Sequence, residues 1–185
     1  NAEGGAYEPP VNCADSESCV VGECLSLCAQ AEAAPSTIGC SFIASRVDNI
    51  YGNETDSLVV GNTSKTKTAT VQLYFTPTNT NAEQPQGEPV NLAPGKTVEF
   101  KLTNAPIAKA SQLRKGGSYR AQSTIPVVAY QHSPIGQQAT NDASLLLPVH
   151  AWGDDYLVPS YHNSDSSDSW VSVISMVDDN EITIE

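Results

Sequence analysis

Short apolar segments that end at Pro, Gly, Asn or Asp follow one another through most of the chain, a spacing typical of the successive strands of a β-sandwich. The clearest of them is 69–76, where Val71, Leu73 and Phe75 alternate with more polar residues and would share one face of a strand. The same pattern predicts strands at 40–47, 57–63, 118–124 and 125–133. With about seven strands expected before Ser133, the sequence predicts an all-β fold, an antiparallel β-sandwich of Ig-like or jelly-roll-like type.

Two proline positions refine this prediction. Residues 90–103, VNLAPGKTVEFKLT, resemble a hairpin in which Pro94 fixes φ and Gly95 adopts the positive φ of a turn. Pro126 lies near the start of the expected strand 125–133. Because proline cannot donate to a ladder, its position indicates an edge strand or an entry bend.

The first 38 residues differ in character, because Gly, Ala, Pro and Glu surround a group of cysteines. Residues 20–33 contain helix-forming residues, and Pro35 would end such a helix. We therefore expect one short helix in an otherwise β-rich chain.

We divide the chain into a Cys-rich N-terminal cap (1–38), a β-sandwich domain (39–140) and a third segment (141–185). The third segment either completes the sheet or begins a second, truncated sandwich, because its spacing of apolar segments resembles that of the first strands. A partial sandwich would leave an unpaired edge and exposed apolar residues such as Val171 and Ile182. Such an edge would take a strand from another chain or from sequence beyond the last residue.

All five cysteines fall within the first 40 residues. They are Cys13, Cys19, Cys24, Cys28 and Cys40. Zinc tolerates the spacing of Cys24 and Cys28, but no second close pair and no histidine is near, so disulfides are favoured. Spacing does not fix the connectivity. We expect Cys13 to pair with Cys19 and a second bridge to form among the other three, which leaves one thiol for a segment outside this sequence or for a second chain.

The charge of the chain excludes some partners. Its formal net charge is -12, with 21 Asp and Glu against 9 Lys and Arg, so its field repels nucleic acid and anionic lipid. No stretch reaches the ~18 apolar residues of a membrane-spanning helix, and we expect no direct membrane insertion. Together with the cysteines and a first residue that is not Met, these features indicate a secreted or cell-surface protein whose signal peptide has been removed.

Several short motifs in the second half of the chain carry a family resemblance. They are 117–120 with Ser123, the segment 126–134, the motif NDASLLLP at 141–148, and Asp155, Tyr156 and 159–161. The motifs and their order resemble the amino-terminal domain of the IgG Fc-binding protein family, found in mucus-associated animal proteins and in secreted or surface proteins of bacteria. The resemblance runs from about Cys40 to Glu185 and implies adhesion or binding, not catalysis.

The motif NDASLLLP has two physical interpretations. As a buried strand, it would use Asn141 and Asp142 to satisfy backbone groups at its start, which is the commoner role of such residues. Alternatively, four polar residues line a ligand groove, namely Tyr130, Gln131, Asn141 and Asp142.

Calcium is the candidate metal, because acidic pairs in loops offer the oxygen ligands that this ion prefers. The pairs are Asp154 with Asp155, Asp165 with Asp168, and Asp178 with Asp179. None has EF-hand spacing, and acidic pairs are also ordinary turn chemistry. The histidines His132, His150 and His162 match no compact metal motif. No other cofactor is expected.

Catalytic motifs are sparse. The chain has no GxSxG motif and no Gly-rich phosphate loop. A carboxylate pair for glycoside cleavage would have to come from Asp142, Asp154 and Asp155. Asn53 and Asn62 begin glycosylation sequons, which matter in a protein secreted through the endoplasmic reticulum.

Taken together, the sequence predicts a secreted or cell-surface, non-catalytic binding or adhesion module that recognises a protein or glycan ligand through its surface. The first alternative is a structural subunit of an extracellular fibre or matrix, whose partners are copies of itself joined by strand exchange or other contacts. The second alternative is a carboxylate-dependent hydrolase.

Overall fold

The computed structural model describes residues 12–47, 55–105, 107, 110–133, 142–159 and 171–184. The fold is all-β and antiparallel, as predicted, with one short α-helix and one 3-10 helix among the described residues. In chain order the elements are β1 (Glu17–Val20), β2 (Glu23–Ser26), α1 (Leu27–Glu32), β3 (Gly39–Ser45), β4 (Asp56–Gly61), β5 (Ala69–Thr76), β6 (Gln84–Pro85), β7 (Val90–Leu92), β8 (Thr97–Leu102), β9 (Ser118–Ser133), β10 (Asp142–Leu145) and η1 (Val149–Ala151).

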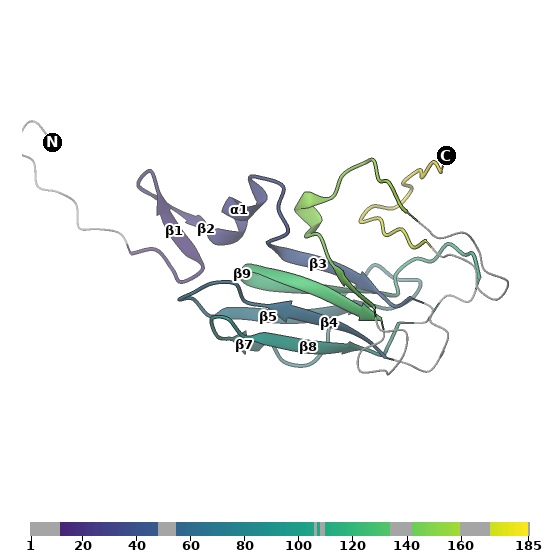
Figure 1. The fold of residues 1–185 in the computed structure, drawn as a ribbon, viewed down its shortest axis with the longest axis horizontal. Helices are drawn as coiled ribbons and strands as arrows, with labels where there is room; N and C mark the ends of the chain where they lie inside the picture. The colour runs from purple at the N-terminus through teal and green to yellow at the C-terminus, as the bar shows by residue number, and fades with distance from the viewer. Residues whose placement is uncertain are drawn as a thin grey trace, which may run out of the picture. The chain divides into compact units, whose positions relative to one another are not determined.

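The long strand β9 joins the two halves of the main sheet (Figure 1). Up to Val127 it pairs with β3 and β5, and from Val128 onward it pairs with β4 and β10. The two strands predicted at 118–124 and 125–133 are therefore one strand. Pro126 does not mark an edge strand or an entry bend, contrary to the prediction, because it lies in the interior of β9, where the pairing passes from one half to the other.

Both halves contribute to one hydrophobic core. Val71, Leu73 and Phe75 of β5 are buried, which confirms the predicted apolar face. On the other half, Leu58 of β4 is fully buried in the same cluster. Tyr119 of β9 belongs to this cluster too, with its ring centroid 4.9 Å from that of Phe75. Burial of this apolar surface from both halves is the main force that holds the sandwich together.

The segment 90–103 is not a hairpin, contrary to the prediction. β7 pairs with β5 and β8 pairs with β4, so the two strands belong to different halves of the sheet. The turn at Pro94 and Gly95 is formed, with Gly95 at φ +69°, but it is a corner between the halves. Asn62 holds this corner, because its N–H donates to the Lys96 carbonyl and its carbonyl accepts from Gly95 N, at 2.9 and 3.0 Å.

The helix predicted at 20–33 is much shorter, because its first half is the β1–β2 hairpin. Val21 and Gly22 both have positive φ, at 51° and 87°. Positive φ at both central residues is the geometry of a two-residue hairpin turn, and it cannot continue a helix. The helix starts only after Ser26, whose side chain accepts a hydrogen bond from Ala29 N at 3.0 Å.

Two disulfides connect the N-terminal region. Cys13 is bonded to Cys24, and Cys28 is bonded to Cys40, so α1 is tied to the start of β3. The expected pairing of Cys13 with Cys19 is wrong. Cys19 is a free, exposed thiol, because Cys13 is bonded instead to the residue that faces Cys19 across the hairpin.

The chain separates into two compact units, 1–152 and 153–185. Apolar alternation predicted strands after residue 170, but residues 171–184 form none. A strand is stable only with ladder partners, which local alternation cannot supply. Among the described residues, no helix has the length and apolar character needed to cross a membrane.

Candidate binding face

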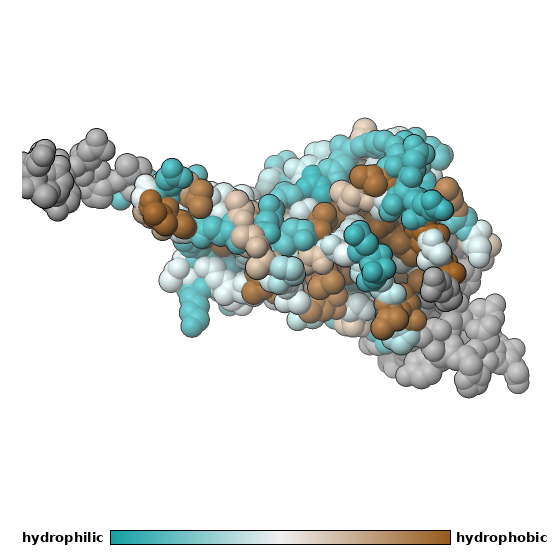
Figure 2. Space-filling view, turned by 90° about the horizontal axis from the view of Figure 1, so that it is seen from above, coloured by the Kyte–Doolittle hydropathy of each residue, from teal (hydrophilic) through white to brown (hydrophobic). Residues whose placement is uncertain are grey.

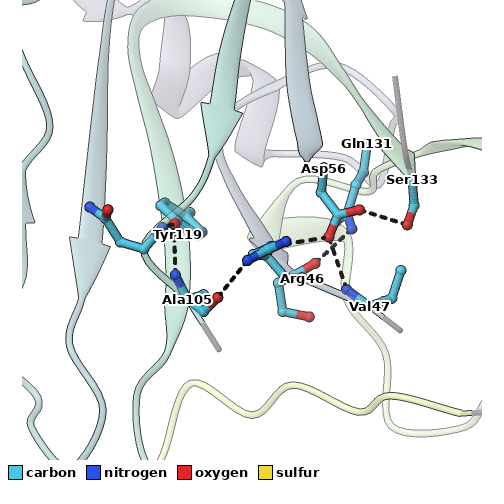
Figure 3. Close-up of polar contacts among 9 residues, drawn as sticks. Arg46, Val47, Asp56, Ala105, Tyr119, Gln131 and Ser133 are labelled. Carbon is cyan, nitrogen blue, oxygen red and sulfur yellow. Dashed lines mark hydrogen bonds and ion pairs between the residues drawn. The ribbon is translucent and has the colours of Figure 1, made fainter. Parts of the chain in front are cut away.

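A partly buried polar cluster joins the end of β3, the start of β4 and the end of β9 (Figure 3). Its centre is the Asp56 carboxylate, which accepts from Ser133 Oγ at 2.7 Å and from Val47 N at 3.1 Å. Arg46 Nε lies 3.7 Å from Asp56 Oδ2, and its guanidinium also donates to the Ala105 carbonyl at 3.2 Å. Burial raises the pKa of Asp56, against the lowering effects of Ser133, Val47 and Arg46. Since both carboxylate oxygens are already occupied, the cluster is suited to holding three strand ends together rather than to acid–base chemistry.

Tyr119 extends this network to the loop after β8. Its hydroxyl accepts hydrogen bonds from the backbone N–H groups of Asn104 and Ala105, at 2.5 and 2.9 Å. Burial raises the pKa of Tyr119, because the charged phenolate would be poorly solvated there. The hydroxyl therefore acts as a neutral acceptor that fixes the loop against β9.

The outer face of the β9–β10 pair is apolar and exposed. Tyr130 of β9 lies directly opposite Leu145 of β10, and cross-strand partners share one face of a sheet. Leu146 packs against the core, so Leu147 returns to the exposed side. Tyr130, Leu145 and Leu147 are 41%, 42% and 41% exposed. We call these three residues the apolar strip.

The backbone beside the strip is anchored on one side only. β10 pairs with β9 from Asp142 to Leu145, and Leu146 N donates to the Ala129 carbonyl at 2.9 Å. No other described strand pairs with β10, so its second edge presents N–H and C=O groups without a ladder partner in the described part of the chain. The strip thus combines exposed apolar side chains with an open sheet edge.

Comparison with known proteins gives one family match. Residues 142–185 match the model of the IgGFc binding protein family. This confirms the predicted resemblance for that segment, which begins at the first residue of β10. No curated protein matches the chain.

One solved structure is similar, the "Crystal Structure of Thermotoga maritima 1070". Its TM-score is 0.36 at 18% sequence identity, and the alignment covers 59% of this chain and 91% of that chain.

The segment that matches the IgGFc binding protein model is less buried at its start than predicted. The motif NDASLLLP was expected to be a buried strand, but its strand, β10, is formed by four residues that are all exposed. Asp142 lies opposite Ser133 on the neighbouring strand. Of the other polar residues proposed for a groove, Gln131 donates to the Ser45 carbonyl at 2.6 Å and so joins β9 to β3. Asn141 lies outside the described residues.

The calcium candidates are not brought together in the described part of the chain. Asp154 and Asp155 are exposed, and Asp178 and Asp179 follow one another in a turn where Asp179 has φ 60°. Asp165 and Asp168 lie outside the described residues, as does His162. No cluster of three or more potential metal ligands occurs in the ranges that the structure describes.

The two described histidines lie on different elements. His132 of β9 faces Ala143 of β10 and Ser57 of β4. His150 lies in η1, where its Nε2 is buried and has no hydrogen-bond partner among the described residues. Its ring packs close to Gly39, where an added Cβ would lie 2.8 Å from His150 Cε1. His150 therefore helps to seat η1 against β3.

One predicted glycosylation site is unsuitable in the folded protein. Asn62 is 3% exposed. Its side-chain Nδ2 donates to the Lys67 and Leu92 carbonyls, both at 2.8 Å, and its Oδ1 accepts from Ser64 N at 2.9 Å. An amide that is fully bonded and buried is a structural group, not an acceptor for a glycan. Asn53 lies outside the described residues.

Proposed function

We propose that this protein is a secreted or cell-surface, non-catalytic binding module that recognises a protein ligand with the apolar strip of β9 and β10. The observation that carries the proposal is the exposure of Tyr130, Leu145 and Leu147 along one open sheet edge. The location supports it, because this edge is the start of the segment similar to a family named for binding. The two disulfides of the N-terminal region fit an oxidising compartment.

The chemistry of the strip favours a protein over other ligands. Tyrosine and leucine side chains supply apolar contact area, while the free edge of β10 offers main-chain hydrogen bonds to an added strand. A polypeptide can use both features at once. The net charge of -12 would in addition favour association with a ligand that has a basic surface.

The test is binding of the full chain to a panel of immobilised extracellular proteins that includes an IgG Fc fragment and a mucin glycoprotein. Leu145→Lys should weaken binding to the recognised protein by about 30-fold, the effect of a hot-spot residue worth ~2 kcal/mol. Leu113→Lys is the matched control, because Leu113 is fully exposed but lies outside β9 and β10. Binding that Leu145→Lys leaves unchanged, or a failure to bind any member of the panel, would contradict the proposal.

A fibre or matrix subunit is the second candidate function. It is favoured by residues 171–184, in which Val171, Val173, Ile182 and Ile184 are at least half exposed and no strand is formed. Such a segment has the composition of a strand that is completed by another copy. Light scattering separates the two functions, because a subunit should form polymers that persist on dilution and disappear when residues 180–185 are deleted. A monomer at all concentrations would exclude the fibre.

A further inference from the structure

The β1–β2 hairpin places a third sulfur next to a disulfide. Val20 lies opposite Glu23 at the two-residue turn, and the next pair is Cys19 opposite Cys24. In a hairpin of this kind the pair at the turn exchanges hydrogen bonds, so the following pair is the non-hydrogen-bonded one, in which Cα atoms are about 4.5 Å apart. Directly opposite side chains lie on the same face. The Cys19 thiol and Cys24 Sγ are therefore neighbours.

Cys24 is within disulfide range of two partners. Its existing bond joins it to Cys13, with the Cα atoms 5.4 Å apart. A Cα separation near 4.5 Å, as expected for Cys19, also falls within the roughly 4.4 to 6.8 Å that disulfides span. Cys19 is the free and exposed cysteine of the chain. Three sulfur atoms, from Cys13, Cys19 and Cys24, thus share a site that holds one disulfide and one thiol.

We propose that these three cysteines form a thiol–disulfide exchange site. The Cys19 thiolate attacks Cys24 Sγ, the Cys19–Cys24 bond forms, the Cys13–Cys24 bond breaks, and Cys13 leaves as a thiolate that takes up the proton lost by Cys19. The number of disulfides and thiols is unchanged, so the step needs no oxidant or reductant. The reverse attack by Cys13 restores the original pairing.

The exchange moves the reactive thiol without moving the sheet. In one isomer the thiol is on β1, and in the other it is on Cys13, which precedes the hairpin. Because the attacking thiol is held on the neighbouring strand, its effective concentration is at least in the ~mM range of tethered groups. The hairpin carries exposed apolar residues at its turn, where Val21 is fully exposed. Figure 2 shows hydrophobic surface, in brown, at the N-terminal end of the described chain.

The second disulfide provides an internal control. Cys40 is 2% exposed and lies at the start of β3, and Cys28 lies on α1. The free thiol of the chain faces Cys24 and not either of these residues. The Cys28–Cys40 bridge should therefore stay intact while the other exchanges.

The first experiment uses the full chain with Cys13→Ser, oxidised in a glutathione redox buffer, blocked with N-ethylmaleimide in acid and digested. Cleavage after Glu17, Glu23 and Glu32, followed by chymotrypsin cleavage after Leu25 or Leu27, places the five cysteines on different peptides. We expect a Cys19–Cys24 disulfide in this variant, together with an intact Cys28–Cys40 bridge. Alkylation of both Cys19 and Cys24, with the second bridge intact, would overturn the proposal.

The second experiment follows the unmodified sequence. The oxidised protein is incubated at pH 8.5 or at pH 4 without any added thiol, then blocked and mapped in the same way. We expect label on both Cys13 and Cys19 at pH 8.5, where thiolate is available, and only on the original thiol at pH 4. Label confined to Cys19 at both pH values would show that no exchange takes place. Cys19→Ser should carry no label on Cys13 or Cys24 at either pH.

Discussion

Replacing Tyr119 with phenylalanine removes a single oxygen atom from the core and tests the loop anchor at the end of the sandwich. That oxygen accepts two backbone hydrogen bonds, from Asn104 N at 2.5 Å and from Ala105 N at 2.9 Å. Each such bond contributes about 1 kcal/mol net, and a buried N–H left without a partner costs ~1–3 kcal/mol. Ala105 is 1% exposed, so water cannot replace the lost acceptor at its N–H. We expect Tyr119→Phe to lower the free energy of unfolding by about 2 to 4 kcal/mol.

The measurement is urea unfolding followed by circular dichroism, with thermal unfolding as a second readout. For a chain of this size the expected loss corresponds to a decrease in Tm of roughly 4 to 16 °C. Tyr130→Phe is the matched control, because it removes the same atom from a side chain that is 41% exposed, and it should change stability by less than about 0.5 kcal/mol. Equal effects of the two substitutions would refute the assignment of the Tyr119 hydroxyl as the anchor.

Three further substitutions test other parts of the structure by urea unfolding. Asn62→Ala should cost about 2 to 4 kcal/mol, because it removes three hydrogen bonds in a residue that is 3% exposed; a loss below ~1 kcal/mol would contradict this. Asp56→Asn tests the raised pKa of Asp56. In the wild type, the contribution of Asp56 to the free energy of unfolding is greatest below its unfolded pKa of 3.8, and it is lost as the pH rises through the raised pKa of the folded state. The stability of wild type relative to Asp56→Asn should therefore fall between pH 3 and pH 7, and an increase would contradict the assignment. Gly116→Ala should be strongly destabilising, because φ is +68° and a Cβ would lie 2.3 Å from the Pro77 carbonyl oxygen; near wild-type stability would show that the loop adapts.

Local alternation located β3, β4, β5, β8 and β9, although it divided β9 into two strands and missed β6. In β5 every second residue is apolar, and those residues are the buried ones. The signal is strong because a strand with one face in the core must repeat with period two. The limit appears at 90–103, where the pattern located the turn at Gly95 but not the pairing of the strands. Pairing depends on the edges offered by β4 and β5, which lie elsewhere in the chain.

The polar cluster and the disulfide pairing lay outside what local pattern predicts. No local pattern links Asp56 to Arg46, and only the ladder between β4 and β9 brings Asp56 to Ser133. The disulfides depend on the Val21 turn. Valine is unusual at positive φ, so the residue types at 20–33 predicted a helix where the structure has a hairpin. Once that hairpin is known, the neighbourhood of Cys19 and Cys24 follows from register alone.

The β4–β9 half of the sheet has two edge strands, β8 and β10, and the difference between them supports a binding role for β10. The edge strand β8 exposes Glu99 and Lys101, and charged side chains on an edge strand discourage pairing with other chains. The edge strand β10 has its single charge at Asp142 and its last residue is the exposed Leu145. An edge that exposes leucine is an aggregation hazard unless a partner covers it. Placing a charge on β10 and a leucine on β8 should therefore separate stability from binding. Leu145→Lys should leave the free energy of unfolding within about 0.5 kcal/mol of wild type. Lys101→Leu should promote self-association, measured by light scattering. Unfolding of Leu145→Lys would instead mean that this residue belongs to the core.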